Sequence, residues 1–365
     1  MYEFKTRLKN SLILLLSLTL FIGITTAGWT PPSYAALPAG NAITDGKALL
    51  RYALPIDNKP VRELQKSIED ISNQLRANKR WSAVNNDLKK ASRILDKPDK
   101  ILASVPAERQ VEAQQLIAQI KTKVDSLREL AEAKDKEKVR SERAQVLDLV
   151  GDLEQAMVKG FPYEVPSEYS NLPQLKGRAT IAIKTNKGDL TVEVDGYSAP
   201  VTAGNFVDLV ERGFYDGLEF TRSEESYVLQ TGKPKGADGF IDPKTNKYRA
   251  IPFEVLVEGD KIPSYGVTLE EAGRYTDMPV LPFSSFGALA LARPERDVNG
   301  GSSQIFFFLF EPELTPAGRN LLDGRYAIFG YVTEGKEVLD QLKAGDKIES
   351  AKVVNGLENL VEPTA

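Results

Sequence analysis

The chain has 365 residues and contains no histidine and no cysteine. These absences exclude a Ser-His-Asp triad, a cysteine nucleophile and any zinc site built from histidine or cysteine ligands. Carboxylate sites for calcium or magnesium remain open, but the sequence holds no calcium-loop pattern. Because no disulfide can form, the compartment has to be inferred from targeting signals rather than from cysteine pairing.

A strong charge of either sign is also lacking, since the formal net charge is −4. Residues 1–35 carry a net charge of +2, so their removal leaves −6. This mild acidity argues against nucleic acid as a partner, because phosphate backbones are bound by clustered lysine and arginine. The length predicts about two domains.

The first residues have the pattern of a secretory signal peptide. A basic start (Lys5, Arg7, Lys9) precedes a compact apolar run at residues 11–24, and the small residues Ser33 and Ala35 offer a cleavage pattern. The run is short for a membrane span of about 20 residues. We therefore predict a cleaved signal at residues 1–35 and no stable membrane span afterwards, with an uncleaved anchor as the alternative.

Residues 44–160 show the periodicity of helices. Apolar residues recur every three or four positions in three sets: Val61, Leu64, Ile68, Ile71 and Leu75; Ala113, Ile117, Ile120, Val124, Leu127 and Ala131; Val146, Leu149, Val150, Leu153 and Met157. Each set forms one stripe on a helix. The segment predicts an antiparallel bundle of four or five helices, whose stripes are either plain core or one seam left open for a partner helix.

A proline-containing stretch at residues 161–177 reads as a linker, and from Arg178 the apolar period changes to two. Alternation on both sides of Asn186-Lys187-Gly188 predicts a β-hairpin. One helix is predicted after Pro200 and another at 335–345, with further strands at 287–293, 303–310 and 326–332. Many strands with two helices predict a closed antiparallel barrel capped at its ends.

Several stretches then match one family in the correct order. These are "NKGDLTVEV", "APVTAGNFVDLVERGFYDGLEFTR", "LQTG", "GALALAR", "SSQIFFFLF" and "LLDGRYAIFGYV". Residues 178–358 therefore resemble the cyclophilin family of peptidyl-prolyl cis/trans isomerases. A signal peptide and a helical bundle ahead of such a domain resemble the large thylakoid-lumen cyclophilins of plants and cyanobacteria. The expected location is the thylakoid lumen, with the periplasm as the alternative, and the short signal fits a cyanobacterium better than a plant.

The resemblance implies a catalytic arginine, Arg222, and a set of substrate-binding positions: Gln230, Tyr227, Val228, Ala292, Gln304, Phe306, Leu322 and Tyr326. Rotation about an X-Pro bond requires no nucleophile, metal or cofactor, because the barrier of about 20 kcal/mol comes from amide resonance. A permanently charged guanidinium can donate a hydrogen bond to the imide nitrogen in the twisted state. Catalysis of this kind is compatible with a chain that has no histidine.

Some positions depart from the family pattern. Leu321 replaces a tryptophan, which we expect to weaken binding of cyclosporin, and Tyr227 and Val228 replace a phenylalanine and a methionine. Glu224 and Glu225 stand close to Arg222 and can pair with it in competition with substrate. An insertion at residues 256–286 can lie over the groove.

Three functional hypotheses follow. The first is an exported isomerase acting on proline-containing segments of client proteins. The second is a peptide-binding assembly protein with weak or absent catalysis; for either, the resemblance implies lumenal loops of photosystem II subunits as clients. The third is autoinhibition, in which the bundle docks on the groove.

Overall fold

The structure is a computed structural model that describes residues 43–76, 80–310 and 320–363. The predicted signal peptide at residues 1–35 lies outside this part of the chain. Within the described residues, no helix combines the length and the apolar composition needed to cross a membrane.

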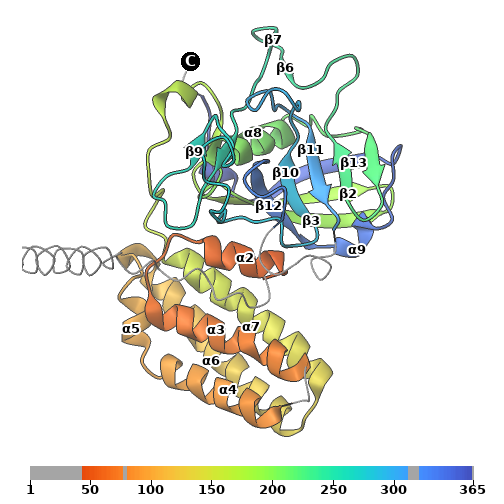
Figure 1. The fold of residues 1–365 in the computed structure, drawn as a ribbon. Helices are drawn as coiled ribbons and strands as arrows, with labels where there is room; N and C mark the ends of the chain where they lie inside the picture. Colours follow the sequence, from red (N-terminus) through yellow and green to blue (C-terminus); the bar gives the residue numbers. More distant parts are fainter. Residues whose placement is uncertain (1–42, 77–79, 311–319, 364–365) are drawn as a thin grey trace, which may run out of the picture. The chain divides into compact units, whose positions relative to one another are not determined.

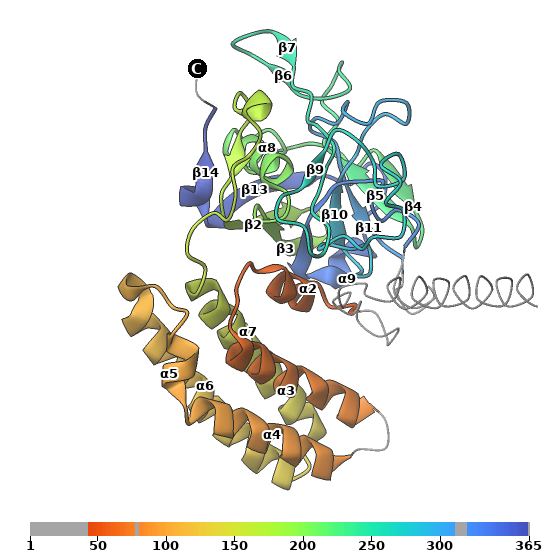
Figure 2. The ribbon, with the colours of Figure 1, turned by 60° about the vertical axis from the view of Figure 1, so that its left-hand side comes forward.

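The N-terminal half is helical, as predicted (Figure 1). Its helices are α2 (Gly46–Ala53), α3 (Lys59–Arg76), α4 (Trp81–Leu95), α5 (Pro98–Leu102), α6 (Gln110–Glu132) and α7 (Lys136–Ala156). The long helices α3, α4, α6 and α7 pack around one apolar core (Figure 2). The predicted stripes lie in that core, except that Leu149 is only half-buried and Leu147 is fully packed instead.

The C-terminal half contains an eight-stranded antiparallel sheet in the order β13-β2-β3-β12-β10-β11-β5-β4. Its strands are β2 (Arg178–Thr185), β3 (Gly188–Asp195), β4 (Arg222–Glu224), β5 (Val228–Thr231), β10 (Ala288–Leu291), β11 (Ile305–Phe308), β12 (Ile328–Glu334) and β13 (Ile348–Asn355). The predicted hairpin is confirmed, because Thr185 pairs with Gly188 across a two-residue turn.

Three two-stranded sheets accompany the main one. They are β1 (Gln174–Leu175) with β14 (Leu360–Val361), β6 (Ile241–Asp242) with β7 (Lys247–Tyr248), and β8 (Glu254–Val255) with β9 (Ser264–Tyr265). The last two pairs lie in the long connection between β5 and β10. This connection is longer than a direct link between two strands requires, and it contains the predicted insertion at residues 256–286.

The predicted closure into a barrel is not confirmed. The main sheet is curled, and within the described residues its edges are β13 and β4. The segment before β4 approaches the start of β13 through one isolated bridge, Glu219 with Lys347, and through bonds such as Phe220 N to Asp346 O at 2.8 Å. Regular strand pairing by β4 begins only at Arg222, so the ladder is not continuous at this seam.

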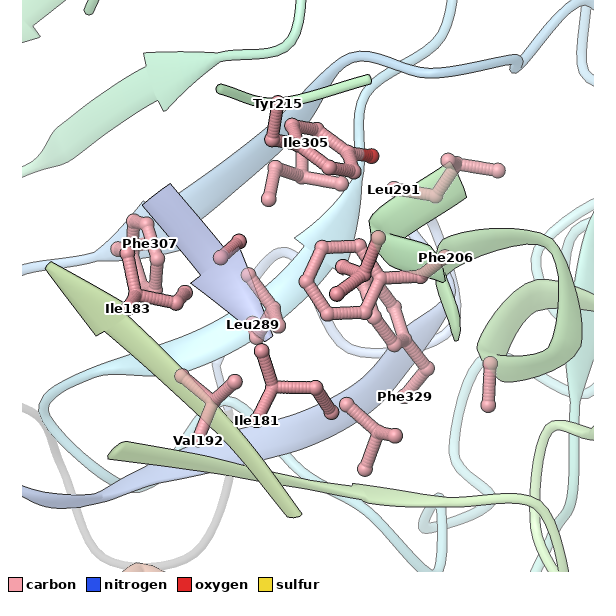
Figure 3. Close-up of a cluster of buried hydrophobic side chains, with 14 of the residues drawn as sticks. Ile181, Ile183, Val192, Phe206, Tyr215, Leu289, Leu291, Ile305, Phe307 and Phe329 are labelled. Atoms are coloured by element: carbon pink, nitrogen blue, oxygen red, sulfur yellow. The ribbon is translucent and has the colours of Figure 1, made fainter. Parts of the chain in front are cut away.

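Alternation along the strands separates two apolar sets. One set faces the inside of the curled sheet with the helix α8 (Pro200–Glu211), and includes Phe206, Leu289, Leu291, Ile305, Phe307 and Phe329 (Figure 3). The other set, on the opposite face, includes Ala288, Ala290, Phe306, Phe308 and Ile328. Because side chains alternate with a period of two, neighbouring phenylalanines of β11 belong to different cores.

The helix α2 covers part of this second face. Its residues Leu49, Leu50 and Ala53 are buried in the cluster with Ala288, Ile328 and Tyr331, not in the core of the four long helices. The contact is close at Gly46, where an added Cβ would lie 2.7 Å from Tyr331 Cβ. Arg178 of β2 also donates from Nη2 to the Leu50 carbonyl. The helix therefore packs as a cover of the sheet.

The second predicted helix is shorter than expected. Residues 335–345 were predicted as one helix, but α9 spans Lys336–Leu339 only. After Leu339 the backbone forms four-residue turns, such as the one closed by Gln341 N to Val338 O, and Gly345 N bonds to Phe220 O. The prediction of the length was wrong because these backbone groups bond outside a helical ladder.

Two buried carboxyl groups join separate segments of the fold. Glu154 of α7 accepts a bond from Arg62 of α3 at 3.1 Å, and Arg62 also donates to the Arg51 and Leu54 carbonyls at the end of α2. Glu254 of β8 accepts bonds from the first turn of α8. Burial raises the pKa of each carboxyl from 4.5 to about 7, outweighing the lowering by neighbouring arginines in one and by hydrogen bonds in the other.

We predict that the protein becomes more stable as the pH falls from 7 towards 5. In this range the folded state holds protons on Glu154 and Glu254 that the unfolded chain releases, so each group lowers the free energy of unfolding by about 1.4 kcal/mol per pH unit of rise. The measurement is urea unfolding at several pH values. Glu154→Gln and Glu254→Gln each flatten the slope, and Glu132→Gln, at an exposed position, leaves it unchanged. An unaltered slope in both buried variants would contradict the prediction.

Candidate active site

Strand register brings the predicted site residues onto one face. Arg222 pairs with Gln230, Gln230 with Phe306, and Phe306 with Ala290, so these residues form a row across β4, β5, β11 and β10. Directly paired residues point to the same side of a sheet. This side is the one on which the second apolar cluster lies. The row therefore has a cation at one end and an aromatic surface near the other.

The Arg222 side chain is 52% exposed. The packing of the helical half therefore leaves the guanidinium accessible, and steric closure of this end of the site by the described helices is not observed. The hypothesis that the bundle docks over the groove stays a prediction, since α2 packs in the cluster that contains Phe306 while Arg222 is exposed.

Two glutamines continue the polar side of the row. Gln230 Nε2 donates to Gln304 Oε1 at 2.8 Å, and Gln304 Nε2 donates to the Asp238 carbonyl at 2.6 Å. This chain of bonds fixes which edge of each amide faces outward. Gly232 of "LQTG" ends β5 with φ +91°, and an added Cβ would lie 2.2 Å from the Ser303 carbonyl oxygen. A glycine is required there because the backbone has a positive φ and passes close to the backbone of Ser303 and Gln304.

The apolar side of the site is built on Phe306. Its ring meets that of Tyr326 edge-on at 5.4 Å, and Val228, Ala292 and Leu322 belong to the same cluster. Phe306 is 5% exposed, whereas Leu322 and Tyr326 are half-buried. Phe306 is therefore the buried floor of the apolar surface, and Leu322 and Tyr326 are its partly accessible sides. Phe306, the site residue that the family resemblance implies, lies on this face, whereas its neighbour Phe307 lies in the other core.

Two residues of this surface were not predicted. Phe283, from the insertion, stacks parallel to Phe306 at 6.0 Å, and its backbone N–H donates to Asp323 at 2.7 Å. Arg293 places its guanidinium carbon 5.0 Å from the Tyr326 ring centre. Arg293 directly follows Ala292, a predicted substrate-binding position, and this proximity in the sequence could have indicated it. Phe283 had no comparable signal, because nothing in the sequence places the insertion against β11.

The rim of the site is exposed. Tyr227 packs edge-on against Phe308 at 6.1 Å but remains 38% exposed, and Leu321, where the family has a tryptophan, is 86% exposed. An exposed leucine offers a substrate less rigid apolar surface than an indole ring.

Arg222 already has an anionic partner. Both Nε and Nη2 donate to Glu224 Oε1, Nε at 2.7 Å. Glu224 lies two residues further along β4 and thus on the same face. The predicted pairing of Arg222 with a neighbouring carboxylate is confirmed for Glu224. A substrate carbonyl or imide nitrogen has to compete with this carboxylate for the guanidinium.

Comparisons with known proteins fit the two halves of the chain. Residues 45–158 match the family model of the PsbQ-like domain of CYP38-like peptidyl-prolyl cis-trans isomerases. Residues 180–358 match the model of cyclophilin-type peptidyl-prolyl cis-trans isomerases. A putative thylakoid lumen peptidyl-prolyl cis-trans isomerase of Synechocystis is 58% identical over 97% of this chain and 95% of its own length.

The chain belongs to the cyclophilin-type peptidyl-prolyl cis-trans isomerases. The chloroplastic CYP38 isomerase of Arabidopsis thaliana is 47% identical over 91% of this cyclophilin and 79% of its own length. The predicted location in the thylakoid lumen is confirmed through such relatives. Among solved structures, a Cryptosporidium parvum cyclophilin is 22% identical with a TM-score of 0.35, covering 48% of this chain and 99% of its own.

The roles of the individual site residues remain predictions. The structure brings Arg222, Gln230, Gln304 and the residues around Phe306 together on one face of this cyclophilin, from strands that are distant in the sequence. It shows geometry that suits peptide binding, namely an exposed cation, a fixed amide pair and an aromatic floor.

We predict that Glu224→Gln raises kcat/KM on a proline tetrapeptide by up to about fivefold. Exposed ion pairs contribute about 0.2–1 kcal/mol, and removing the carboxylate charge returns that energy to substrate binding. The matched control is Glu225→Gln, because Glu225 is the adjacent exposed carboxylate and no ion pair to it is seen in the described residues. Equal effects of the two variants would show that general charge, and not the pairing, matters.

Proposed function

We propose that this cyclophilin isomerises X-Pro bonds in client proteins of the thylakoid lumen, and that lumenal loops of photosystem II subunits are among its clients. The observation that carries the first part is the exposed Arg222 in one cross-strand row with Gln230 and the Phe306 floor. Membership of the isomerase family and the lumenal relatives support the same reading.

In this proposal the site residues have to bind the peptide and donate a hydrogen bond to the imide nitrogen. The proline ring rests on the Phe306 and Tyr326 surface, the Gln230 amide holds the peptide backbone, and the Arg222 guanidinium faces the imide. As the C–N bond twists, resonance is lost and the nitrogen regains a lone pair that can accept a hydrogen bond. Arg222 stabilises this state more than either planar state, which is the requirement for catalysis.

The first test is a proline-tetrapeptide isomerase assay on the full chain and its Arg222→Ala variant. Loss of one donor to a transition state costs about a hundredfold or more in rate, so we expect the variant to lose nearly all activity while retaining its fold by circular dichroism. Lys233→Ala removes a nearby exposed cation that pairs with Asp238 instead and is the control. Full activity of Arg222→Ala would refute the catalytic assignment.

A second function, a peptide-binding assembly scaffold, is favoured by one specific observation. Glu224 holds the guanidinium in the uncomplexed protein, which reduces its availability for catalysis. Among the described residues, no carboxylate competes at the half-buried Tyr326 and Leu322 or at the glutamine pair, so a peptide can still bind there. In this reading, the groove captures proline segments of assembling subunits without turning them over.

The two functions separate in a cyanobacterium that lacks its own relative of this protein. If isomerisation is needed, the wild-type chain restores assembly of photosystem II on native gels and Arg222→Ala does not. If binding alone is needed, Arg222→Ala restores assembly as well, and Gln230→Ala with Gln304→Ala fails. Because α2 is part of the cover of the sheet, point variants are preferable to deletion of residues 44–160.

A further inference from the structure

A cavity of about 280 Å³ in the helical half is lined by residues of α3, α4 and α5 and by Lys97, which follows α4. Pro60 and Ile94 supply apolar surface, and Glu63 is the one carboxylate of the lining. The remaining lining residues are all cations: Lys59, Lys90, Arg93, Lys97 and Lys100. The cavity thus carries a positive charge in a protein whose net charge is negative.

These cations outnumber the carboxylates around them. Within the part of the chain that the structure describes, none of the five forms an ion pair or a side-chain hydrogen bond, and neither does Glu63. Neighbouring lysines behave differently: Lys66 pairs with Asp70 at 3.3 Å on α3, and Lys121 of α6 pairs with Asp96 at 2.7 Å just after α4. Other exposed lysines of the bundle, such as Lys89 and Lys159, form no ion pair with the described residues either, so the cavity is distinguished by the convergence of five exposed cations at α3, α4 and α5 on one site.

The arrangement opposes folding in two ways. Lys90, Arg93 and Lys97 follow one another at spacings of three and four, where like charges on a helical face repel. Lys59 is the first residue of α3, the end of a helix at which a positive charge is disfavoured. Arg93 and Lys100 lie in the last turns of α4 and α5, where a cation is favoured, so the unfavourable helix-end placement concerns Lys59.

We propose that this cavity is a binding site for a compact polyanion that carries phosphate or sulfate groups. Such a ligand neutralises the cations from three helices at once and removes the repulsion between them. Lysine ammonium groups bind phosphate as point charges, and the Arg93 guanidinium can bind it with two parallel hydrogen bonds. The cavity volume suits a small charged group and not a folded segment, since ligand pockets for drug-sized molecules begin near 300 Å³.

The site is separate from the isomerase groove. Its residues belong to α3, α4 and α5 and the residue after α4, whereas the groove is built on β4, β5, β10 and β11. Activity on a proline peptide is therefore not the readout of this proposal, and its failure would not touch the proposed function. The same chemistry can come from a free anion or from the headgroup of an anionic lipid.

The experiment measures binding of inorganic pyrophosphate to the full chain by calorimetry at low ionic strength. The cavity variant is Lys90→Gln with Lys97→Gln. The matched control is Lys89→Gln with Lys159→Gln, which removes the same charge at exposed positions outside the cavity, one of them adjacent to Lys90. A second cavity variant, Lys59→Gln with Lys100→Gln, covers the case in which the first does not fold.

We expect the wild type and the control to bind pyrophosphate with similar affinity and both cavity variants to bind at least about tenfold more weakly. Without ligand, the cavity variants should unfold at a higher temperature than the control at low ionic strength, since their repulsion is reduced. Equal binding by all four proteins, or no binding by the wild type, would overturn the proposal.

A second arm distinguishes the source of the anion. Vesicles of phosphatidylcholine with and without phosphatidylglycerol are sedimented with each protein. Sedimentation of the wild type and control, but not of the cavity variants, with anionic vesicles assigns the site to a lipid headgroup. Binding of pyrophosphate without sedimentation assigns it to a free anion.

Discussion

The register of four strands is the constraint on which the site depends. Arg222, Gln230, Phe306 and Ala290 share one face only because β4, β5, β11 and β10 pair as they do. A slip of one residue in β11 would send Phe306 into the inner core and bring Phe307 outward. The inner core prevents such a slip, because Phe307 and Ile305 fill it with Leu289 and Phe206. Packing of the inner core therefore determines which side chains face the site on the outer side of the sheet.

The outer face has to serve three purposes at once. It receives α2, it receives Phe283 of the insertion, and it offers the remaining surface around Tyr326 and Leu322 to a peptide. Burial of Leu49 and Leu50 contributes about 1.5–3 kcal/mol for each side chain, so this cover is a substantial part of the stability of the sheet. An open apolar groove of full length would not persist in water without such a cover. The cover by α2 and Phe283 thus leaves Tyr326 and Leu322 as the partly accessible apolar surface of this face.

The sequence alone predicted the elements in which one spacing of apolar residues dominates. The stripes of α3 and α6, the hairpin around Asn186-Lys187 and the helix after Pro200 follow from spacing and turn chemistry alone. The site residues came from the family resemblance, because alternation cannot decide which of Phe306 and Phe307 faces outward. The contact of Phe283 with Phe306 and the placement of α2 on the sheet depend on long-range packing. The closed barrel was an over-interpretation, since periodicity says nothing about a seam formed by irregular backbone.

Charge is distributed in opposite ways in the two halves. At the groove, Arg222 is balanced by Glu224 at hydrogen-bond distance, so its field is largely cancelled until a substrate displaces the carboxylate. In the bundle, the cavity at α3, α4 and α5 gathers five cations and one carboxylate, Glu63, so the positive charge is in excess. In the same half, Glu154 of α7 is buried beside Arg62, and burial raises the pKa of its carboxyl. Because cancelled charge favours stability and uncancelled charge favours recognition, the unbalanced cluster is the part of the helical half most directly suited to binding a ligand.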